Sequence, residues 1–273
     1  MMRFSLPFYK MVASGNDFVV VDNRKGIVGD IKEFARKVCA GHTGIGADGV
    51  LLLENSRRAD FKMRIINSDG SEAEACGNGF RCIALFAKEK LSCPSEFRFE
   101  SLAGIITAHV KAQRVCVELP VPSELELDQS LEALGHRLHY AFLNTGVPHA
   151  VIFVEGLPKI DVEEIGRAVR HHGNFKPRGT NVNFVQVEND KTISVRTYER
   201  GVENETLACG TGSTASAVVS VLKGYVRSPV QVKTRGGEIL EINIQCDGKK
   251  ITRVTLEGEA RFVCEGKMAA GLL

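Results

Sequence analysis

Apolar and polar positions alternate along much of the chain, which predicts a protein dominated by β-strands. Alternating or short β-branched runs cover residues 17–22, 49–54, 61–67, 105–111, 115–119, 149–154, 182–188, 192–199, 230–234, 239–244 and 253–257. Helical periodicity is confined to the segments 31–40, 77–91, 162–171 and 210–223. This mixture predicts an α/β (α+β) fold with many strands and few helices.

The two halves of the chain repeat one order of elements. In each half a helix, a Gly-containing turn and two strands lead to the motif Glu-x-x-Ala-Cys-Gly-x-Gly, which contains Cys76 in the first half and Cys209 in the second. Such a repeat predicts two similar, pseudo-symmetric domains. We expect each to be a strongly curved mixed sheet wrapped around a central buried helix, with the active site in the cleft between them.

A boundary is predicted near the middle of the chain. Pro120, Pro122 and an acidic stretch to Asp128 are typical of a linker. We therefore expect an N-terminal domain over residues 1–121 and a C-terminal domain over 122–259. The C-terminal tail, about residues 260–273, is expected to pack back on the N-terminal domain.

Each motif cysteine lies where a thiol becomes acidic. Cys76 and Cys209 each precede a predicted helix and are followed by two glycines. A helix N-terminus lowers a thiol pKa, and its unpaired N–H groups also bind a carboxylate and the charge that develops on it. The second helix has no charged residue from Gly210 to Leu222, and the first has only Arg81 between Gly77 and Lys88, which predicts that both are buried.

Two opposed thiols could invert an α-carbon. The reaction needs a base on one face of the carbon and an acid on the other, and equivalent groups let it run in both directions. A single cysteine before a glycine turn is usually a cap or core residue, but the matched second copy favours a catalytic pair. No cofactor and no metal is required.

Charge and hydropathy limit the kinds of partner that this protein could bind. The 273 residues carry a net charge of +2 without a basic run, which argues against nucleic acid as a partner. Neither a signal peptide nor a membrane-spanning segment is recognisable, so we expect a cytoplasmic protein.

The remaining cysteines predict no metal site. None of the eight cysteines has Cys-x-x-Cys spacing, so structural zinc and a disulfide framework are not expected. Apolar neighbours around Cys39, Cys116 and Cys264, and the helical position of Cys82, predict small core residues.

Several longer motifs resemble one family, the diaminopimelate epimerases, which are pyridoxal-phosphate-independent amino-acid epimerases related to proline racemase and the phenazine isomerase. The resemblance covers nearly the whole chain and rests on Ser14-Gly15-Asn16-Asp17-Phe18-Val19, Asn67-Ser68-Asp69-Gly70-Ser71-Glu72, Cys76-Gly77-Asn78-Gly79-Phe80-Arg81-Cys82, Gly179-Thr180-Asn181-Val182-Asn183-Phe184, Tyr198-Glu199-Arg200-Gly201 and Cys209-Gly210-Thr211-Gly212. It implies an isomerase that converts LL-2,6-diaminopimelate to the meso form, in lysine and peptidoglycan precursor biosynthesis, and that works as a homodimer.

The resemblance also implies roles for individual residues. Cys76 and Cys209 are then the base and the acid. The reacting carboxylate is surrounded by Gly77, Asn78, Gly210 and Thr211. At the unreactive end Arg200 binds the distal carboxylate and Glu199 the distal ammonium, with added hydrogen bonds from Asn16, Asn67 and Asn181. Taken singly, the asparagines could equally form turns, and Glu199 and Arg200 could form an exposed ion pair.

Three departures from the family pattern concern substrate binding more than proton transfer. Many members carry Gln where this chain has Gly49 and Asn where it has Val147, and one extra residue lies within 202–204. Asn144 is a candidate replacement for the missing amide. The type of reaction is therefore predicted more firmly than the substrate.

Other functions remain open. A related racemase of another amino acid fits the same motifs. A cysteine hydrolase could pair Cys76 or Cys209 with His149, although the second cysteine loop would then be unexplained. A non-catalytic amino-acid binder is a third interpretation. A nicotinamide enzyme is not expected, because the Gly-x-Gly-x-x-Gly at 44–49 follows a helix and precedes a strand, the reverse of a dinucleotide site.

Overall fold

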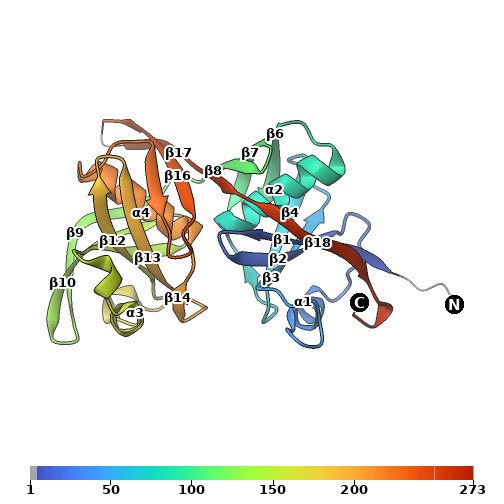
Figure 1. Ribbon diagram of the computed structural model, residues 1–273, viewed down its shortest axis with the longest axis horizontal. Coiled ribbons are helices and arrows are strands. Elements are labelled where there is room, and N and C mark those ends of the chain that lie inside the picture. The colour runs from blue at the N-terminus through green and yellow to red at the C-terminus, as the bar shows by residue number, and fades with distance from the viewer. Residues whose placement is uncertain (1–4, 249, 273) are drawn as a thin grey trace. The chain divides into compact units, whose positions relative to one another are not determined.

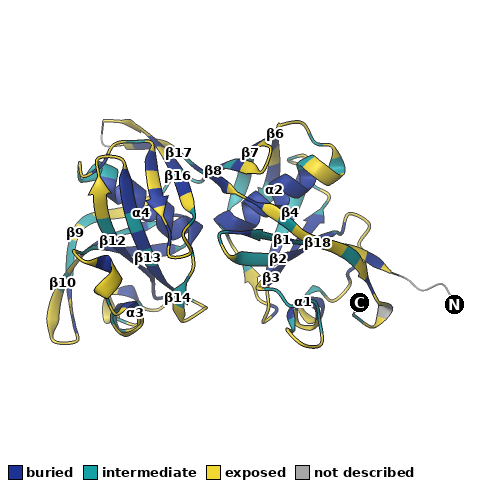
Figure 2. Ribbon diagram, viewed as in Figure 1, coloured by how far each residue is buried: buried dark blue, intermediate teal, exposed yellow. Residues whose placement is uncertain are grey.

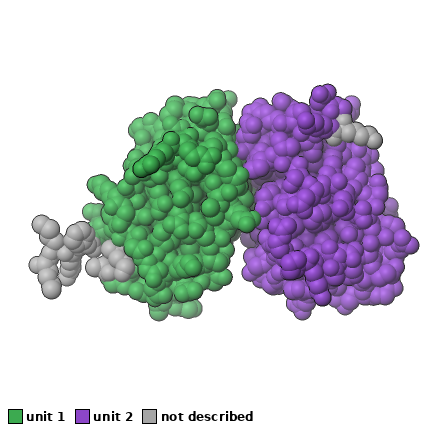
Figure 3. All heavy atoms as spheres, turned by 180° about the vertical axis from the view of Figure 1, so that it is seen from behind, with its two compact units in different colours: residues 1–117, 258–273 green, residues 118–257 purple. Residues whose placement is uncertain are grey.

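Strands make up most of the regular secondary structure, with four α-helices in the described ranges, so the fold is mixed α/β (Figure 1). The computed structural model describes residues 5–248 and 250–272. The first four residues of the predicted N-terminal domain and the last residue of its tail lie outside these ranges. The chain divides into unit 1, Met1–Val117 with Gly258–Leu273, and unit 2, Glu118–Glu257 (Figure 3).

Unit 1 builds its sheet from both ends of the chain. Its elements are β1 (Leu6–Ala13), β2 (Asn16–Asp22), α1 (Ile31–Cys39), β3 (Gly49–Glu54), β4 (Phe61–Asn67), β5 (Glu72–Ala73), α2 (Gly77–Leu91), β6 (Glu96–Ser101), β7 (Gly104–Lys111), β8 (Arg114–Leu119) and β18 (Arg261–Met268). Strands β18, β1 and β2 pair antiparallel, β2 pairs with β3 in parallel, and β3 pairs with β4 antiparallel. Strand β4 then pairs in parallel with β6, which continues antiparallel to β7 and β8.

Unit 2 repeats this order and this pairing. Its elements are β9 (Ser123–Ala133), β10 (His136–Asn144), β11 (Pro148–Phe153), α3 (Val162–Arg170), β12 (Asn181–Asn189), β13 (Thr192–Glu199), β14 (Asn204–Thr206), α4 (Gly210–Leu222), β15 (Val230–Lys233), β16 (Ile239–Asp247) and β17 (Lys250–Glu259). Strand β11 pairs with β12 in parallel and β13 with β15 in parallel, as β2 does with β3 and β4 with β6. The repeat seen in the sequence is therefore a repeat of structure.

Two kinds of helix follow from two kinds of sequence. Helices α1 and α3 begin at Asp30 and Asp161, whose carboxylates accept N–H groups of the first turn, and each buries one face. The α1 face packs on strands through Phe34 and Val38, each large side chain contributing about 1.5–3 kcal/mol. By contrast, α2 is buried from Gly77 to Ala87 and α4 from Gly210 to Ser220, as predicted (Figure 2).

The four predicted helices are confirmed, but the strand predictions missed β1, β5, β6, β9, β10, β14 and β18. The predicted linker is wrong from Ser123 to Asp128, because β9 begins at Ser123 and pairs antiparallel with β10; residues 120–122 do lie between strands. Charged and polar side chains dominate the exposed first half of β9, which hides its strand pattern. No helix in the described part of the chain is both long and apolar enough for a membrane crossing.

The prediction that four cysteines are small core residues is confirmed for two of them. Cys39 and Cys82 are buried, as expected, but Cys116 is only partly buried and Cys264 is exposed. Cys264 lies on β18, where Met268 is the one buried residue of the strand. The apolar neighbours of Cys264 therefore belong to a largely exposed strand and not to a core.

We predict that Gly166→Ala destabilises unit 2. A Cβ at Gly166 of α3 would lie 2.5 Å from Cβ of Tyr198 on β13. Alanine favours a helix by about 1 kcal/mol over glycine, but overpacking usually costs about 1–3 kcal/mol, so urea denaturation should give a net loss of unfolding free energy. Gly173→Ala is the control, because nothing lies within 4 Å of its Cβ position. Equal stability of Gly166→Ala and the wild type would contradict the close packing.

Candidate active site

Cys76 is the N-cap of α2. Its backbone is extended, with φ −150° and ψ 110°, and its Sγ accepts a hydrogen bond from the N–H of Gly79 at 3.4 Å. The sulfur therefore takes up one of the amides that a helix N-terminus leaves unpaired. The side chain is partly exposed, so it combines helix-end polarisation with access to small molecules.

Cys209 caps α4 in the same way. Its φ and ψ are −122° and 111°, and its Sγ accepts the N–H of Gly212 at 3.4 Å. The hydroxyl of Thr211 lies 3.4 Å from the same sulfur, and the Thr211 carbonyl accepts the hydroxyl of Thr145 at 3.2 Å. Cys209 is more deeply buried than Cys76, at 6% exposure. Both cysteines thus have the helix-start geometry that the sequence predicted.

Arg81 stabilises the loop that contains Cys76. This guanidinium is fully buried and donates to the Asn78 side chain at 2.7 Å, to Ser14 Oγ, and to the carbonyl of Glu259 at 3.2 Å. A buried cation is tolerated only where its donors are satisfied. The Asn78 side chain therefore serves the loop's own structure, while its backbone belongs to the first turn of α2.

Asn16, one of the predicted substrate-binding residues, lies beside Cys76. Its Nδ2 donates to Asp48 at 2.5 Å, and its Oδ1 accepts from the Cys76 thiol at 3.6 Å. A carboxylate only accepts, so Asp48 fixes the orientation of the Asn16 amide. Burial, reinforced by Asp17 and Asp48, raises the pKa of the nearby Cys39 thiol to about 12, which keeps this cysteine neutral.

Three predicted residues gather in unit 2 where β12 begins and β13 ends. The buried Asn181 donates to the carbonyl of Pro148 at 3.1 Å and accepts the backbone N–H of Arg200 at 2.8 Å. Arg200 Nη1 reaches the carbonyl of Arg178 at 3.4 Å, and the Glu199 carboxylate accepts the hydroxyl of Thr206 at 3.0 Å. Asn181 thus anchors the backbone on which the predicted distal-end groups stand.

The hydrogen bonds of Asn67 belong to a turn. Its backbone N–H and its Nδ2 donate to the carbonyl and hydroxyl of Ser71, at 2.8 and 2.9 Å, around Gly70 with φ +85°. Asn144 likewise accepts from Gly146 N at 3.0 Å and donates to Glu124 at 3.2 Å. Substrate-binding roles for Asn67 and Asn144 remain predictions.

Gly49 has a local reason for being glycine. A Cβ there would lie 2.8 Å from the carbonyl oxygen of Ile66 on the neighbouring strand β4. Any larger side chain would require the backbone to shift. Close packing against β4 therefore accounts for the glycine that this chain has where many members of the family have glutamine.

Two residues that contact the predicted site residues were not predicted from the sequence, namely Asp48 and Asn183. Asp48 lies in the glycine-rich segment 44–49, whose pattern resembles a dinucleotide fingerprint, and this segment joins α1 to β3. Asn183 follows Asn181 by two residues on β12, so both side chains point to the same face. That strand periodicity was the available signal for Asn183.

His149 is fully buried next to Asn183. Its Nδ1 lies 3.1 Å from Nδ2 of Asn183, and its Nε2 has no hydrogen-bond partner among the described residues. Burial, with a smaller contribution from the Arg200 charge, lowers the pKa of His149 to about 3. The imidazole is therefore neutral at physiological pH.

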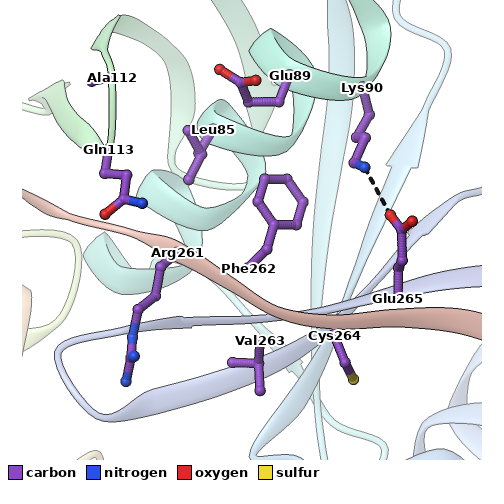
Figure 4. A pocket seen from close by; sticks show the side chains of 10 residues that line it. All are labelled: Leu85, Glu89, Lys90, Ala112, Gln113, Arg261, Phe262, Val263, Cys264 and Glu265. Carbon is purple, nitrogen blue, oxygen red and sulfur yellow. Dashed lines mark hydrogen bonds and ion pairs between the residues drawn. The ribbon is translucent and has the colours of Figure 1, made fainter.

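A hollow of about 510 Å³ in unit 1 is separate from the cysteine loops. It lies between α2 and β18, and its lining includes Leu85, Glu89, Lys90, Phe262 and Glu265. Lys90 and Glu265 form an ion pair of 2.7 Å across one side (Figure 4). None of the residues predicted to bind substrate lines this hollow. Within the described ranges, no group of three or more His, Cys, Asp or Glu could hold a metal ion.

The chain is similar over nearly its whole length to proteins of one family. A family model described as diaminopimelate epimerase matches residues 8–119 and 141–263. The diaminopimelate epimerase of Aquifex aeolicus (strain VF5) is 49% identical over 281 residues, covering 98% of this chain and 99% of that protein. The diaminopimelate epimerase of Hydrogenobaculum sp. (strain Y04AAS1) is 44% identical over 274 residues, covering 95% and 97%.

More distant solved structures share the fold. A hydroxyproline epimerase from Agrobacterium vitis, with bound trans-4-OH-L-proline, matches with a TM-score of 0.75 at 17% identity, over 98% of this chain and 94% of that one. A phenazine biosynthesis protein of the PhzF family from Bacillus anthracis matches with a TM-score of 0.74 at 14% identity, over 97% and 99%. Near-complete coverage at up to 49% identity, together with two matched cysteine caps, establishes that this chain belongs to the diaminopimelate epimerase family.

Proposed function

We propose that this protein is a diaminopimelate epimerase, an isomerase that converts LL-2,6-diaminopimelate to meso-2,6-diaminopimelate without a cofactor. One observation carries the proposal. A chain that is similar over its full length to diaminopimelate epimerases places a cysteine at the N-cap of each of its two buried helices.

The reaction moves one proton off the α-carbon and another onto its opposite face. The thiolate of one cysteine takes the α-proton, and the electron pair of the broken C–H bond moves onto the substrate carboxylate. The thiol of the other cysteine then gives its proton to the opposite face of the carbon, so the two cysteines exchange protonation states. The reverse reaction uses them in exchanged roles, as two-base catalysis requires.

The charge that develops on the carboxylate needs fixed donors. The first-turn amides of α2, from Gly77 and Asn78, and of α4, from Gly210 and Thr211, are the groups proposed to supply them. In this proposal the two loops act on one substrate. Its support is the duplicated cap geometry of Cys76 and Cys209.

The distal end of the substrate carries a second carboxylate and a second ammonium. Arg200 is proposed to bind the former and Glu199 the latter, with Asn16, Asn67 and Asn181 adding hydrogen bonds. Asn181 supports this role indirectly, because it holds the backbone N–H of Arg200. The relatives that are 40–49% identical are diaminopimelate epimerases, whereas the hydroxyproline epimerase is only 17% identical, which favours the longer, doubly charged substrate.

A cysteine hydrolase is the weaker alternative. It would need His149 as a base close to a nucleophilic thiol. A pKa of about 3 makes this imidazole a poor base at neutral pH, and its Nδ1 is already engaged with Asn183. Neither feature interferes with a two-thiol epimerase.

The remaining expectations follow from the family. We propose that the enzyme acts in lysine and peptidoglycan precursor biosynthesis, in the cytoplasm, on a free amino acid and without a nucleic-acid partner. We also propose a homodimer, for which the family resemblance is the support.

The proposed reaction predicts α-proton exchange that depends on both cysteines. In deuterated water, the wild type should convert LL-diaminopimelate to the meso form with deuterium at the α-carbon, while proline and glutamate stay unlabelled. Because a positioned acid or base contributes about 10²–10⁴-fold, Cys76→Ser and Cys209→Ser should each reduce turnover by at least about 10²-fold. The exposed Cys246→Ser is the control and should keep full activity. Absence of exchange with all three amino acids would refute an epimerase, and loss of activity in only one cysteine variant would favour a hydrolase.

The low pKa of His149 predicts a pH dependence of stability. Below about pH 6 the unfolded chain binds a proton at this residue, while the folded chain does not until about pH 3. The free energy of unfolding should therefore fall on acidification, by about 1.4 kcal/mol per pH unit from this residue alone. Urea titrations of His149→Gln should show a slope against pH that is smaller by this amount. Identical slopes for His149→Gln and the wild type would mean that the folded chain protonates His149 normally.

The homodimer is tested by sedimentation velocity at micromolar concentration. The expected species has twice the mass of the chain, without added substrate. A single species of chain mass across the concentration series would remove the dimer from the proposal.

A further inference from the structure

The starts of the two buried helices rest on different side chains, although their caps are alike. A Cβ at Gly79 of α2 would meet Met63 Cε at 3.2 Å and Leu51 Cδ2 at 3.3 Å. A Cβ at the equivalent Gly212 of α4 would lie 2.2 Å from Oδ1 of Asn183. The first turn of α2 therefore packs on apolar side chains, whereas the first turn of α4 packs on the buried amide of Asn183.

Asn183 is fixed by contacts at both ends of its amide. Its Nδ2 donates to the carbonyl of Ala150 at 3.1 Å and lies 3.1 Å from Nδ1 of His149. Its Oδ1 accepts the hydroxyl of Thr197 at 3.0 Å. A carbonyl only accepts, so Ala150 sets the amide orientation, and Nδ1 of His149 must be the acceptor. The imidazole proton is then on Nε2.

This network is deeply buried. Asn183 and His149 are 0% exposed and Thr197 is 3% exposed. Burying polar groups costs free energy unless they are hydrogen-bonded. Unit 1 builds the same helix start with Leu51 and Met63, so the fold itself does not require a polar support at this place.

We infer that Asn183 is a positioning residue for Cys209. The Asn183 amide, fixed by His149 and Thr197, holds Gly212 in place, so that the N–H of Gly212 points at the sulfur. The inference rests on the proposed function and deepens it. It assigns to the second proton-transfer group a support that the first lacks.

The connection from Asn183 to the sulfur is short. Asn183 Oδ1 lies against Gly212, and the Gly212 N–H donates to Cys209 Sγ at 3.4 Å. A hydrogen bond to a thiolate depends strongly on distance and angle, and small displacements of catalytic groups are costly. A displaced Gly212 would leave the Cys209 thiolate less stabilised and the thiol less acidic.

The test replaces the polar support with the apolar one found in unit 1. Asn183→Leu imitates Leu51 at nearly constant size. In a Cys76→Ser background, the alkylation rate of Cys209 by iodoacetamide is followed by peptide mass spectrometry at constant pH. We expect Asn183→Leu to slow this rate about 10- to 100-fold, as for the loss of one hydrogen bond to an ionised group. Ser220→Ala, which removes a buried hydroxyl farther along α4, is the matched control and should leave the rate unchanged.

Two further readouts separate positioning from general destabilisation. With Cys76 intact, Asn183→Leu should lower kcat for diaminopimelate while KM changes less than twofold. Nitrogen NMR of His149 should show protonated Nε2 in the wild type and a mixture of tautomers in Asn183→Leu. If Asn183→Leu does not fold, Thr197→Val tests the same support, and Thr197→Ser, which keeps the hydroxyl, should restore the wild-type rate.

The outcomes are distinct. An unchanged alkylation rate in Asn183→Leu and in Thr197→Val would overturn the positioning role, as would a wild-type His149 protonated on Nδ1. A wild type that fails to epimerise diaminopimelate would refute the proposed function alone, because the alkylation and NMR results need no substrate.

Discussion

The hydrogen bond from a helix-start N–H to a cysteine sulfur is the interaction on which the proposed chemistry of this protein depends. Gly79 and Gly212 make it at Cys76 and Cys209, each at 3.4 Å. It forms because each cysteine is extended while the next residues are helical, which directs free amides at the side chain. A thiol placed there is polarised by the helix, and the remaining amides of the turn face the same space.

This interaction requires helices whose bodies are buried. Charged residues are absent from α4, and in α2 the one charged residue before Lys88 is the buried Arg81. Arg81 turns its charge inward to Ser14, Asn78 and a main-chain carbonyl, so it stabilises the loop. Buried helix bodies fix where the caps lie, because each helix is held on all sides by strands and cannot rotate or slide freely.

The duplicated units have become chemically unequal behind their equal caps. Leu51 supports the first helix start, and Asn183, linked to His149 and Thr197, supports the second. The residues that surround each sulfur also differ, since the Asn16 amide lies beside Cys76 and the Thr211 hydroxyl beside Cys209. A reversible two-base reaction tolerates such inequality, because its two groups never need the same protonation state at the same time.

The sequence by itself determined the features that depend on local pattern. Helical periodicity placed the four helices within one residue at each end, and the repeated cysteine motif identified both caps. The exposed strand β9 and the exposure of Cys264 escaped, because edge strands carry polar residues and their apolar residues need not face a core. Only the tertiary structure decided that Asp48 orients Asn16 and that Asn183 lies beneath Gly212. These contacts join residues about 30 positions apart in the chain, so they arise only when strands and helices pack together.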